Sequence, residues 1–307
     1  MTVALLAGGT GGGKLAAGLQ ALLGDELTVI ANTGDDTELH GLYVSVDPDL
    51  VTFWLAGVID EERGWGYSDD AFTVHEHLQK LGAPGWFGLT DRDLATSLYR
   101  THFLAEGGSL SAAQAQIARA LGARATVLPM SEDRVRTLVE TAAGPRGLQE
   151  FLILDRGEGE IAGIRLEGIE SATPTVQVLR ALEEAELIVI APSNPVISIG
   201  PILALPGVRA AIERSEAPVI AVSPLVAGRS VKGPTEAFLR GVGRPVSAAG
   251  VASLYAGLLA GMIVDDGDPE PGPDDVARLR CPTLMNDESS RRALAERVLE
   301  FGRSLDR

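Results

Sequence analysis

The chain has 307 residues, 45% of them hydrophobic, so it can bury a large core as one big domain or two. A formal net charge of −16 argues against general nucleic-acid affinity, and any phosphorylated ligand must be held by local hydrogen-bond donors or a cation. The single cysteine, Cys281, excludes an internal disulfide and a cysteine metal cluster, which predicts a reducing, cytoplasmic setting. The apolar stretches fall short of the roughly 18 residues that span a membrane, and no basic leader precedes the first, so neither membrane span nor signal peptide is predicted.

The N-terminal segment predicts two strands, each followed by a distinctive loop. Apolar runs at residues 2–7 and 27–31 predict the strands, and a helical pattern covers residues 15–23. The first strand leads into GGTGGGK at residues 8–14, and the second ends in NTGDD at residues 32–36. Glycines let a backbone approach a phosphate closely, and the following helix offers unpaired N–H groups. This pattern predicts an anion-binding loop at residues 8–14.

The glycine loop matches neither of two common nucleotide-binding motifs. Leu15 stands where a P-loop needs a serine or threonine, and Lys14 stands where G-x-G-x-x-G has its third glycine. A tight turn without a ligand is the alternative. The chain has only three lysines, so a lysine inside this loop is better explained by a phosphate than by solubility. The candidate residues in this loop are Gly9, Thr10, Gly11, Gly12 and Lys14.

The remaining chain alternates helical and strand patterns around a purely helical block. A loop is expected at residues 47–50, helical patterns occupy residues 50–58, 69–81, 91–104 and 109–121, and a loop is expected at 270–273. Strands are predicted at residues 125–130, 136–141, 149–154, 161–170, 187–191, 218–222 and 261–266. Further helices are predicted at residues 175–186, 206–213, 235–240 and 287–302. The pattern is typical of an α/β protein with buried parallel strands.

Four of the buried strands end in small, polar or acidic residues. These ends are residues 8–14, 32–36, 192–195 and 223–224. In an open parallel sheet, ligands bind beyond the carboxyl ends of the strands. We therefore expect these ends to meet at one crevice.

Asp35 and Asp36 are the strongest candidates for acid–base chemistry or metal binding. Carboxylates near phosphates suit Mg²⁺, which takes oxygen ligands. The alternative is an N-cap and a solvated partner for the next element. Asp47 and Asp49 form an Asp-x-Asp pattern around a proline. This pattern is common in plain turns, so a turn and a functional site are equally good explanations of it.

Other candidates have ordinary structural alternatives. Ser193, Asn194 and Pro195 follow a buried strand and could supply a hydroxyl and an amide to a ligand, although both polar residues also favour turns. Asp91 and Arg92 open a predicted helix, where capping is the ordinary explanation. Trp65 could stack on a flat ring or pack in the helical block. Ser223 follows a predicted strand. Lys232 lies in a predicted loop, and it either binds a phosphate or is an ordinary solvent-exposed lysine.

Taken in order, these segments resemble a known family. GGTGGGK, NTGDD, PDL, RGWG, DRDLAT, LPMSED, APSNPVISIGPIL, AVSPLV and VKGP look like the 2-phospho-lactate transferase family of coenzyme F-420 biosynthesis, from residue 3 to about residue 286. The resemblance implies a doubly wound, mostly parallel, Rossmann-like α/β core at residues 1–58 and 123–307, with an inserted helical subdomain at 59–122. It also implies a homodimer.

The resemblance further implies an activity and a set of site residues. The family moves a phospholactyl or phosphoenolpyruvyl group from a guanosine diphosphate-linked donor to the terminal hydroxyl of a deazaflavin riboside, with release of GMP and a need for Mg²⁺. By position, residues 9–14 would contact donor phosphates, and Asn32, Asp35 and Asp36 would face the metal and the reacting phosphate. The segment from Ser193 to Ser198 would bind the donor, and the segment from Asp91 to Thr96 would border the deazaflavin.

One position departs from the family pattern P-D-L-D-T. Val51 stands where its second aspartate is expected, so Asp47 or Asp49 is left to substitute, and we assign Asp49 with Asp35 and Asp36 as metal candidates. Two other functions stay open. A non-catalytic nucleotide-sugar sensor has a similar glycine loop and NTGDD, whereas the glycine spacing argues against a dinucleotide oxidoreductase.

Overall fold

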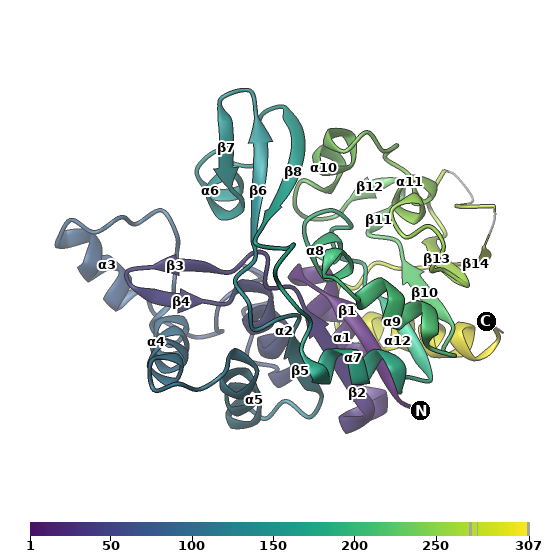
Figure 1. Ribbon diagram of the computed structural model, residues 1–307, viewed down its shortest axis with the longest axis horizontal. Helices are drawn as coiled ribbons and strands as arrows, with labels where there is room; N and C mark the ends of the chain where they lie inside the picture. The colour runs from purple at the N-terminus through teal and green to yellow at the C-terminus, as the bar shows by residue number, and fades with distance from the viewer. Residues whose placement is uncertain (270–271, 275, 306–307) are drawn as a thin grey trace.

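A seven-stranded parallel sheet forms the centre of the computed structural model, which describes residues 1–269, 272–274 and 276–305. The strand order is β14-β13-β10-β9-β1-β2-β5, and every neighbouring pair is parallel (Figure 1). The strands are β1 (Val3–Ala7), β2 (Leu27–Ala31), β5 (Thr126–Pro129), β9 (Leu187–Ile190), β10 (Val219–Val222), β13 (Gly261–Asp265) and β14 (Ala277–Cys281). The doubly wound α/β class is confirmed.

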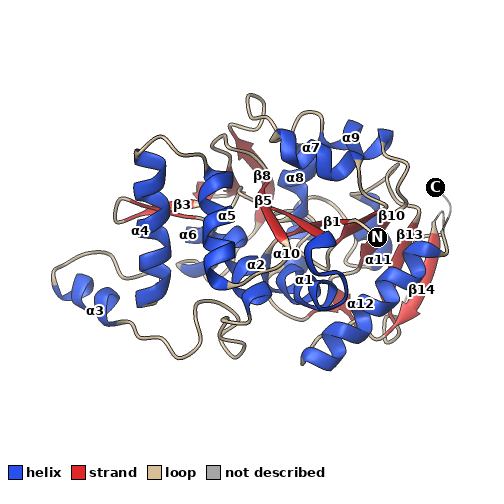
Figure 2. Cartoon of the chain, turned by 90° about the horizontal axis from the view of Figure 1, so that it is seen from below, coloured by secondary structure: helices blue, strands red, loops and turns tan. Residues whose placement is uncertain are grey.

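Helices cover both faces of this sheet, which explains why its inner strands are apolar throughout (Figure 2). One hydrophobic cluster joins the sheet to α1 (Gly9–Leu23), α2 (Val46–Ala56) and α12 (Glu288–Arg303). The cluster on the other face includes residues of α7 (Val176–Glu183), α8 (Ile199–Ala204), α9 (Val208–Arg214), α10 (Thr235–Gly241) and α11 (Ala248–Ser253). Within the described residues, no helix combines the length and apolar character needed to cross a bilayer.

The strand order places a topological switch point beside β1. From β1 the chain first adds β2 and β5 on one side, and later adds β9, β10, β13 and β14 on the other. In such sheets the connections diverge at this point, which leaves a crevice beyond the carboxyl ends of the two strands. The segments that follow β1 and β9 therefore flank the crevice.

Several smaller elements lie outside the central sheet (Figure 1). Between α2 and β5 come the helices α3 (Thr73–Lys80), α4 (Asp91–Ala105) and α5 (Leu110–Leu121), as predicted, and before α2 comes the hairpin of β3 (Thr37–Leu39) and β4 (Leu42–Val44). A second sheet contains β6 (Arg136–Thr141), β7 (Gly144–Gly147) and β8 (Ile161–Glu167). It carries α6 (Leu148–Ile153), and β11 (Leu225–Val226) pairs with β12 (Arg229–Ser230). The division into a core and a helical subdomain stays a prediction.

Three local predictions were wrong. Residues 149–154 form a helix, α6, rather than a strand, because a short apolar run does not distinguish the two. The predicted loop at 47–50 is the first part of α2, where a proline is tolerated because early N–H groups have no intrahelical partner. The glycine run is helical from Gly9 onwards. Of the expected loop at 270–273, residues 270 and 271 lie outside the described residues.

Close packing explains part of the glycine run. A Cβ at Gly11 would collide with the carbonyl oxygen of Pro192, and one at Gly13 would collide with the Trp54 ring. Glycine at these positions lets the start of α1 lie directly against the segment after β9 and against α2. The run therefore brings the start of α1 to the switch point.

Candidate active site

A cavity of about 480 Å³ lies at the switch point, beyond the carboxyl ends of the central strands. Segments after β1, β2, β9 and β10 all contribute to its lining. The residues predicted from sequence that line it are Gly9, Thr10, Gly11, Lys14, Asp35, Trp65, Ser193, Asn194, Ser198, Ser223 and Lys232. The structure thus brings together strand ends that lie more than 200 residues apart in the chain.

A buried amide joins two carboxylates at one wall of the cavity. Asn32 Nδ2 lies 2.9 Å from both Asp35 Oδ1 and Asp47 Oδ2. Asp47 Oδ1 also accepts a hydrogen bond of 2.7 Å from the backbone N–H of Gly9, the first residue of α1. Asp35 and Asp47 line the cavity, whereas Asn32 is fully buried behind them. One amide side chain therefore orients both carboxylates.

Burial shifts the pKa of both carboxyl groups upward. The pKa of Asp35 is raised well above its usual value, chiefly by burial and then by the neighbouring charge of Asp47. Burial raises the pKa of Asp47 to about 6, although Asn32 and the Gly9 N–H oppose the shift. Two crowded carboxyl groups of this kind favour either a shared proton or a cation.

Asp36 points away from the cavity. Its Oδ2 accepts hydrogen bonds from Tyr43 Oη at 2.8 Å and Ser45 Oγ at 3.0 Å. The side chain is buried, and burial raises the pKa of Asp36 to about 7. Asp36 is not among the residues that line the cavity. These contacts link the acidic loop to β4 and the start of α2.

Asp49 also faces away from the cavity and pairs with a buried arginine. Its carboxylate bonds Arg100 Nη2, and the Arg100 side chain has no exposed surface. Arg100 additionally donates to the carbonyl of Tyr43 and to Gln114 Oε1, both at 3.3 Å. Asp49 thus connects α2 to α4.

Val51 lies in the hydrophobic cluster under the sheet with no exposed surface. An aspartate at this position would face the core, not the cavity. The Asp-x-Asp spacing of the family pattern is present two residues earlier, at Asp47 and Asp49. Of this pair, Asp47 lines the cavity. The site therefore keeps its acidic residues although Val51 replaces an aspartate.

Two lysines reach the cavity from segments that lie far apart in the chain. Lys14 Nζ donates to the carbonyl of Met285 at 2.7 Å, and burial, followed by the charge of Arg291, lowers the Lys14 pKa. Lys232 Nζ donates to the carbonyl of Arg63 at 2.6 Å. Both ammonium groups lie among the lining residues, where a phosphate could replace a carbonyl as their partner.

An ordered turn at residues 60–66 borders the mouth of the cavity. Arg63 pairs with Asp60, and its guanidinium lies over the rings of Trp65 and Phe72. Thr10 Oγ1 donates to the carbonyl of Gly64 at 3.3 Å, which ties the turn to the start of α1. Trp65 is 39% exposed and lines the cavity, so its ring is available to a flat ligand.

Six other predicted residues lie outside the lining. Gly12 packs on Ser193 and Ala7, and Pro195 lines a second, smaller cavity of about 240 Å³. The remaining four are Asn32, described above, and Asp91, Arg92 and Thr96 at the start of α4.

The start of α4 makes capping and anchoring contacts. Thr90 and Asp93 form a capping box, and Asp91 Oδ1 accepts from the Val74 N–H at 2.9 Å. The Arg92 N–H donates to Asp70, and Thr96 Oγ1 lies 3.0 Å from Tyr67 Oη. The DRDLAT segment therefore anchors the elements around the 60–66 turn, and its ligand role stays a prediction.

The sequence could not identify some of the lining residues. The sequence leaves Asp47 open between a site residue and an ordinary turn residue, because its helix is predicted to begin later. Gln149, Thr283 and Met285 line the cavity from segments without a recognisable motif. Thr283 and Met285 lie between β14 and α12, and the packing of α12 against α1 brings them to the site.

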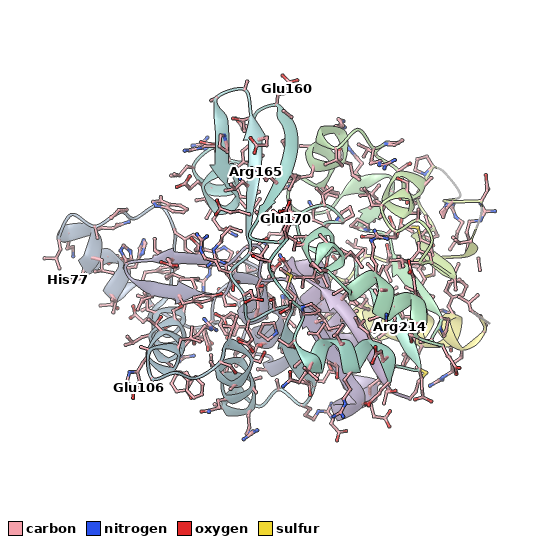
Figure 3. The ribbon with its side chains drawn as sticks, viewed as in Figure 1. His77, Glu106, Glu160, Arg165, Glu170 and Arg214 are labelled. Atoms are coloured by element: carbon pink, nitrogen blue, oxygen red, sulfur yellow. The ribbon has the colours of Figure 1, made fainter. Side chains whose placement is uncertain are left out.

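The carboxylate pair fits Mg²⁺ better than a metal held by protein ligands alone. Within the described residues, no group of three or more His, Cys, Asp or Glu side chains could hold a metal. Figure 3 shows His77 at the outer end of α3, away from the central strands. Mg²⁺ commonly uses one or two carboxylates together with substrate phosphates and water. Asp35 and Asp47 supply such a donor set.

Fold and site together define a doubly wound α/β protein whose ligand crevice combines carboxylates, lysines and a helix start. The pattern of the 2-phospho-L-lactate transferase CofD family matches residues 3–278, and the chain belongs to this family. It is 42% identical to a phosphoenolpyruvate transferase from Streptomyces griseus, over 98% of each chain. It is 39% identical to a 2-phospho-L-lactate transferase from Methanopyrus kandleri, over 98% of this chain and 97% of that one. A UPF0052-family protein from Bacillus halodurans shares the fold, with a TM-score of 0.63 at 18% identity, over 97% of this chain and 98% of that one.

Proposed function

We propose that the protein transfers a phospholactyl or phosphoenolpyruvyl group from a guanosine diphosphate-linked donor to the terminal hydroxyl of 7,8-didemethyl-8-hydroxy-5-deazariboflavin. The acceptor oxygen forms a bond to the phosphorus that bears the lactyl or enolpyruvyl group. The bond from that phosphorus to the bridging oxygen breaks, and GMP leaves. We assign this activity to coenzyme F-420 biosynthesis, as the family resemblance of the sequence implies.

The single observation that carries this proposal is the meeting of Lys14, Lys232 and the Asp35–Asp47 pair around one cavity. Two cations and the N–H groups at the start of α1 suit a diphosphate. The volume of about 480 Å³ lies in the range of small-molecule sites. Apolar residues on the remaining wall, among them Trp65 and Leu284, suit a flat deazaflavin ring.

The residues of this chain have distinct roles in the proposal. Lys14 and Lys232 bind the diphosphate, and Asn32 orients the two carboxylates behind it. Mg²⁺, when held by Asp35 and Asp47, neutralises charge on the diphosphate. The carboxylate of Asp35, which lines the cavity, accepts the hydroxyl proton. Positioning and charge neutralisation thus account for the rate, with no covalent enzyme intermediate.

Incubation with deazaflavin riboside, Mg²⁺ and each of the two guanosine donors, followed by mass spectrometry, tests the proposal. We expect a phosphodiester product and GMP with at least one donor, and loss of the product in Asp35→Ala. Unchanged turnover in Asp35→Ala at saturating Mg²⁺ would remove this residue from the mechanism. Donor binding without turnover would instead favour a nucleotide-sugar sensor.

A further inference from the structure

Asp265, at the end of β13, lies outside the cavity and is almost fully buried, with 5% of its surface exposed. Its Oδ1 accepts from the N–H groups of Ala227 at 3.2 Å and Gly267 at 3.0 Å. Its Oδ2 accepts from both the N–H and the hydroxyl of Thr283, each at 3.0 Å. One carboxylate therefore joins three separate segments of backbone.

Two of these segments form one wall of the cavity. Val226, next to Ala227, lines the cavity, and so do Thr283 and Met285. The Met285 carbonyl accepts the hydrogen bond from Lys14 Nζ. A short path of contacts thus leads from Asp265 through Thr283 and Met285 to the ammonium group of Lys14.

Further hydrogen bonds hold the loop after β13 in place. The Gly228 N–H donates to Asp268 Oδ1. Arg280 Nη2 donates to the carbonyls of Asp266 at 2.8 Å and Asp268 at 2.7 Å. The loop after β13 is therefore held at several points, and Asp265 is the point that reaches the cavity wall.

We propose that Asp265 is a positioning residue, which sets the cavity wall at residues 283–285 and thereby the place of the Lys14 ammonium group for an anionic ligand. Asp265 does not touch that ligand. If the anionic ligand is the guanosine donor, the inference rests on the function proposed above.

The chemistry requires a carboxylate at this position. Four hydrogen-bond donors converge on Asp265, and an ionised carboxylate can accept from all of them. An asparagine would turn an NH₂ group towards two of these donors. Burial by itself would raise the pKa of Asp265, but the hydrogen bonds from Thr283, Gly267 and Ala227 outweigh it and lower that pKa below its usual value. The group is therefore charged at neutral pH.

Asp265→Asn tests the inference, and Asp266→Asn is the matched control because Asp266 is adjacent and exposed. In Asp265→Asn we expect the KM for the guanosine donor to rise about tenfold while kcat changes less than about threefold. The ¹³C methyl resonance of Met285 should shift in Asp265→Asn and stay unchanged in Asp266→Asn. An unchanged KM in folded Asp265→Asn, or an unchanged Met285 resonance, would overturn the inference.

A second pair of variants covers the case in which Asp265→Asn does not fold. Thr283→Val removes one of the four donors and keeps the backbone, and Thr283→Ser restores the hydroxyl. We expect the Val variant to raise the KM and the Ser variant to restore it. Equal KM values in both variants would contradict the inference.

Binding of inorganic pyrophosphate, measured by calorimetry, separates this inference from the proposed function. If the wild-type protein turns over neither guanosine donor, the proposed function fails. Pyrophosphate affinity still depends on Lys14, and we expect it to fall about tenfold in Asp265→Asn but not in Asp266→Asn. Equal affinity in Asp265→Asn and the wild type would overturn the positioning role even if turnover is found.

Discussion

Asp47 and Asp49 lie two residues apart on α2, yet their side chains meet different surroundings. Asp47 faces the cavity and shares Asn32 with Asp35, whereas Asp49 faces α4 and pairs with Arg100. Residues two apart on a helix point in different directions, which explains the separation. We therefore expect their charges to contribute to different properties, Asp47 to the proposed chemistry and Asp49 to stability.

Replacement of each by asparagine should separate these properties. We expect Asp47→Asn to lower kcat by roughly 10²-fold, the usual order for loss of one electrostatic contact to the transition state. Asp49→Asn should lower the free energy of unfolding by about 3 kcal/mol, because it leaves the buried Arg100 without its ionised partner. Urea unfolding and steady-state kinetics on both variants measure this. A collapse of activity in fully folded Asp49→Asn would instead support the metal role predicted for Asp49 from the sequence.

At the scale of elements, the loop after β12 and the turn at residues 60–66 meet beside the cavity. Lys232 Nζ bonds the Arg63 carbonyl, and both Lys232 and Gly64 line the cavity. Val231 is 62% exposed, so the loop that carries the lysine has little packing of its own. The turn, by contrast, is held by the Asp60–Arg63 ion pair. We therefore expect the loop, rather than the turn, to adjust when a phosphate binds Lys232.

Lys232→Met keeps the length of the side chain and removes its charge. We expect the KM for the guanosine donor to rise about tenfold, since a charged hydrogen bond to phosphate contributes roughly 1.5–3 kcal/mol, with kcat within about threefold of wild type. Lys80→Met, at the exposed end of α3, is the control and should change neither value. Steady-state kinetics with varied donor provides the measurement. Equal KM values in the two variants would show that Lys232 does not contact the donor.

The elements also show how far the sequence predicts this fold. The sequence predicts the buried strands β1, β2, β9, β10 and β13 because each is a short, almost wholly apolar run that ends in turn or polar residues. The edge strand β14 was missed because its sequence, ARLRC, is polar and largely exposed. The strand ends alone predict the crevice, but the sequence does not decide between Asp47 and Asp49 as the partner of Asp35. Asp47 reaches the site only because α2 begins at Val46 and packs against α1, and that contact is tertiary.

At the scale of the whole molecule, several carboxyl groups are buried in an already acidic protein. Asp35, Asp36, Asp47, Asp49 and Asp93 are all buried, and burial is the first cause of a raised pKa at each. Arginine charges near Asp36 and Asp49 oppose the shift, but burial still raises the pKa of both. The folded state therefore binds protons more tightly than the unfolded chain does across the mildly acidic range, so its stability should fall as pH rises.

Asp93 offers a test of this dependence outside the cavity. Burial raises the pKa of Asp93 to about 6, from an ordinary value near 4. Below about pH 4 both states are protonated there, and between pH 4 and 6 the folded state holds the proton that the unfolded chain has lost. The neutral form of Asp93 therefore makes its full contribution to the free energy of unfolding below about pH 4. That contribution, on the order of 2–3 kcal/mol, is lost as the pH rises through 6.

Asp93→Asn should remove this part of the pH dependence, because an amide does not titrate in this range. Its oxygen can still accept the Thr90 N–H and so keep that half of the capping box at the start of α4. We expect the variant to match wild type near pH 4 and to be more stable by up to about 2 kcal/mol at pH 8, as measured by urea unfolding in metal-free buffer. Asp91→Asn, in the same turn and only partly buried, is the control and should follow the wild-type curve. If the Asp93→Asn and wild-type curves run parallel from pH 4 to 8, the proton on Asp93 does not contribute, and the pH dependence arises at the other buried carboxyl groups.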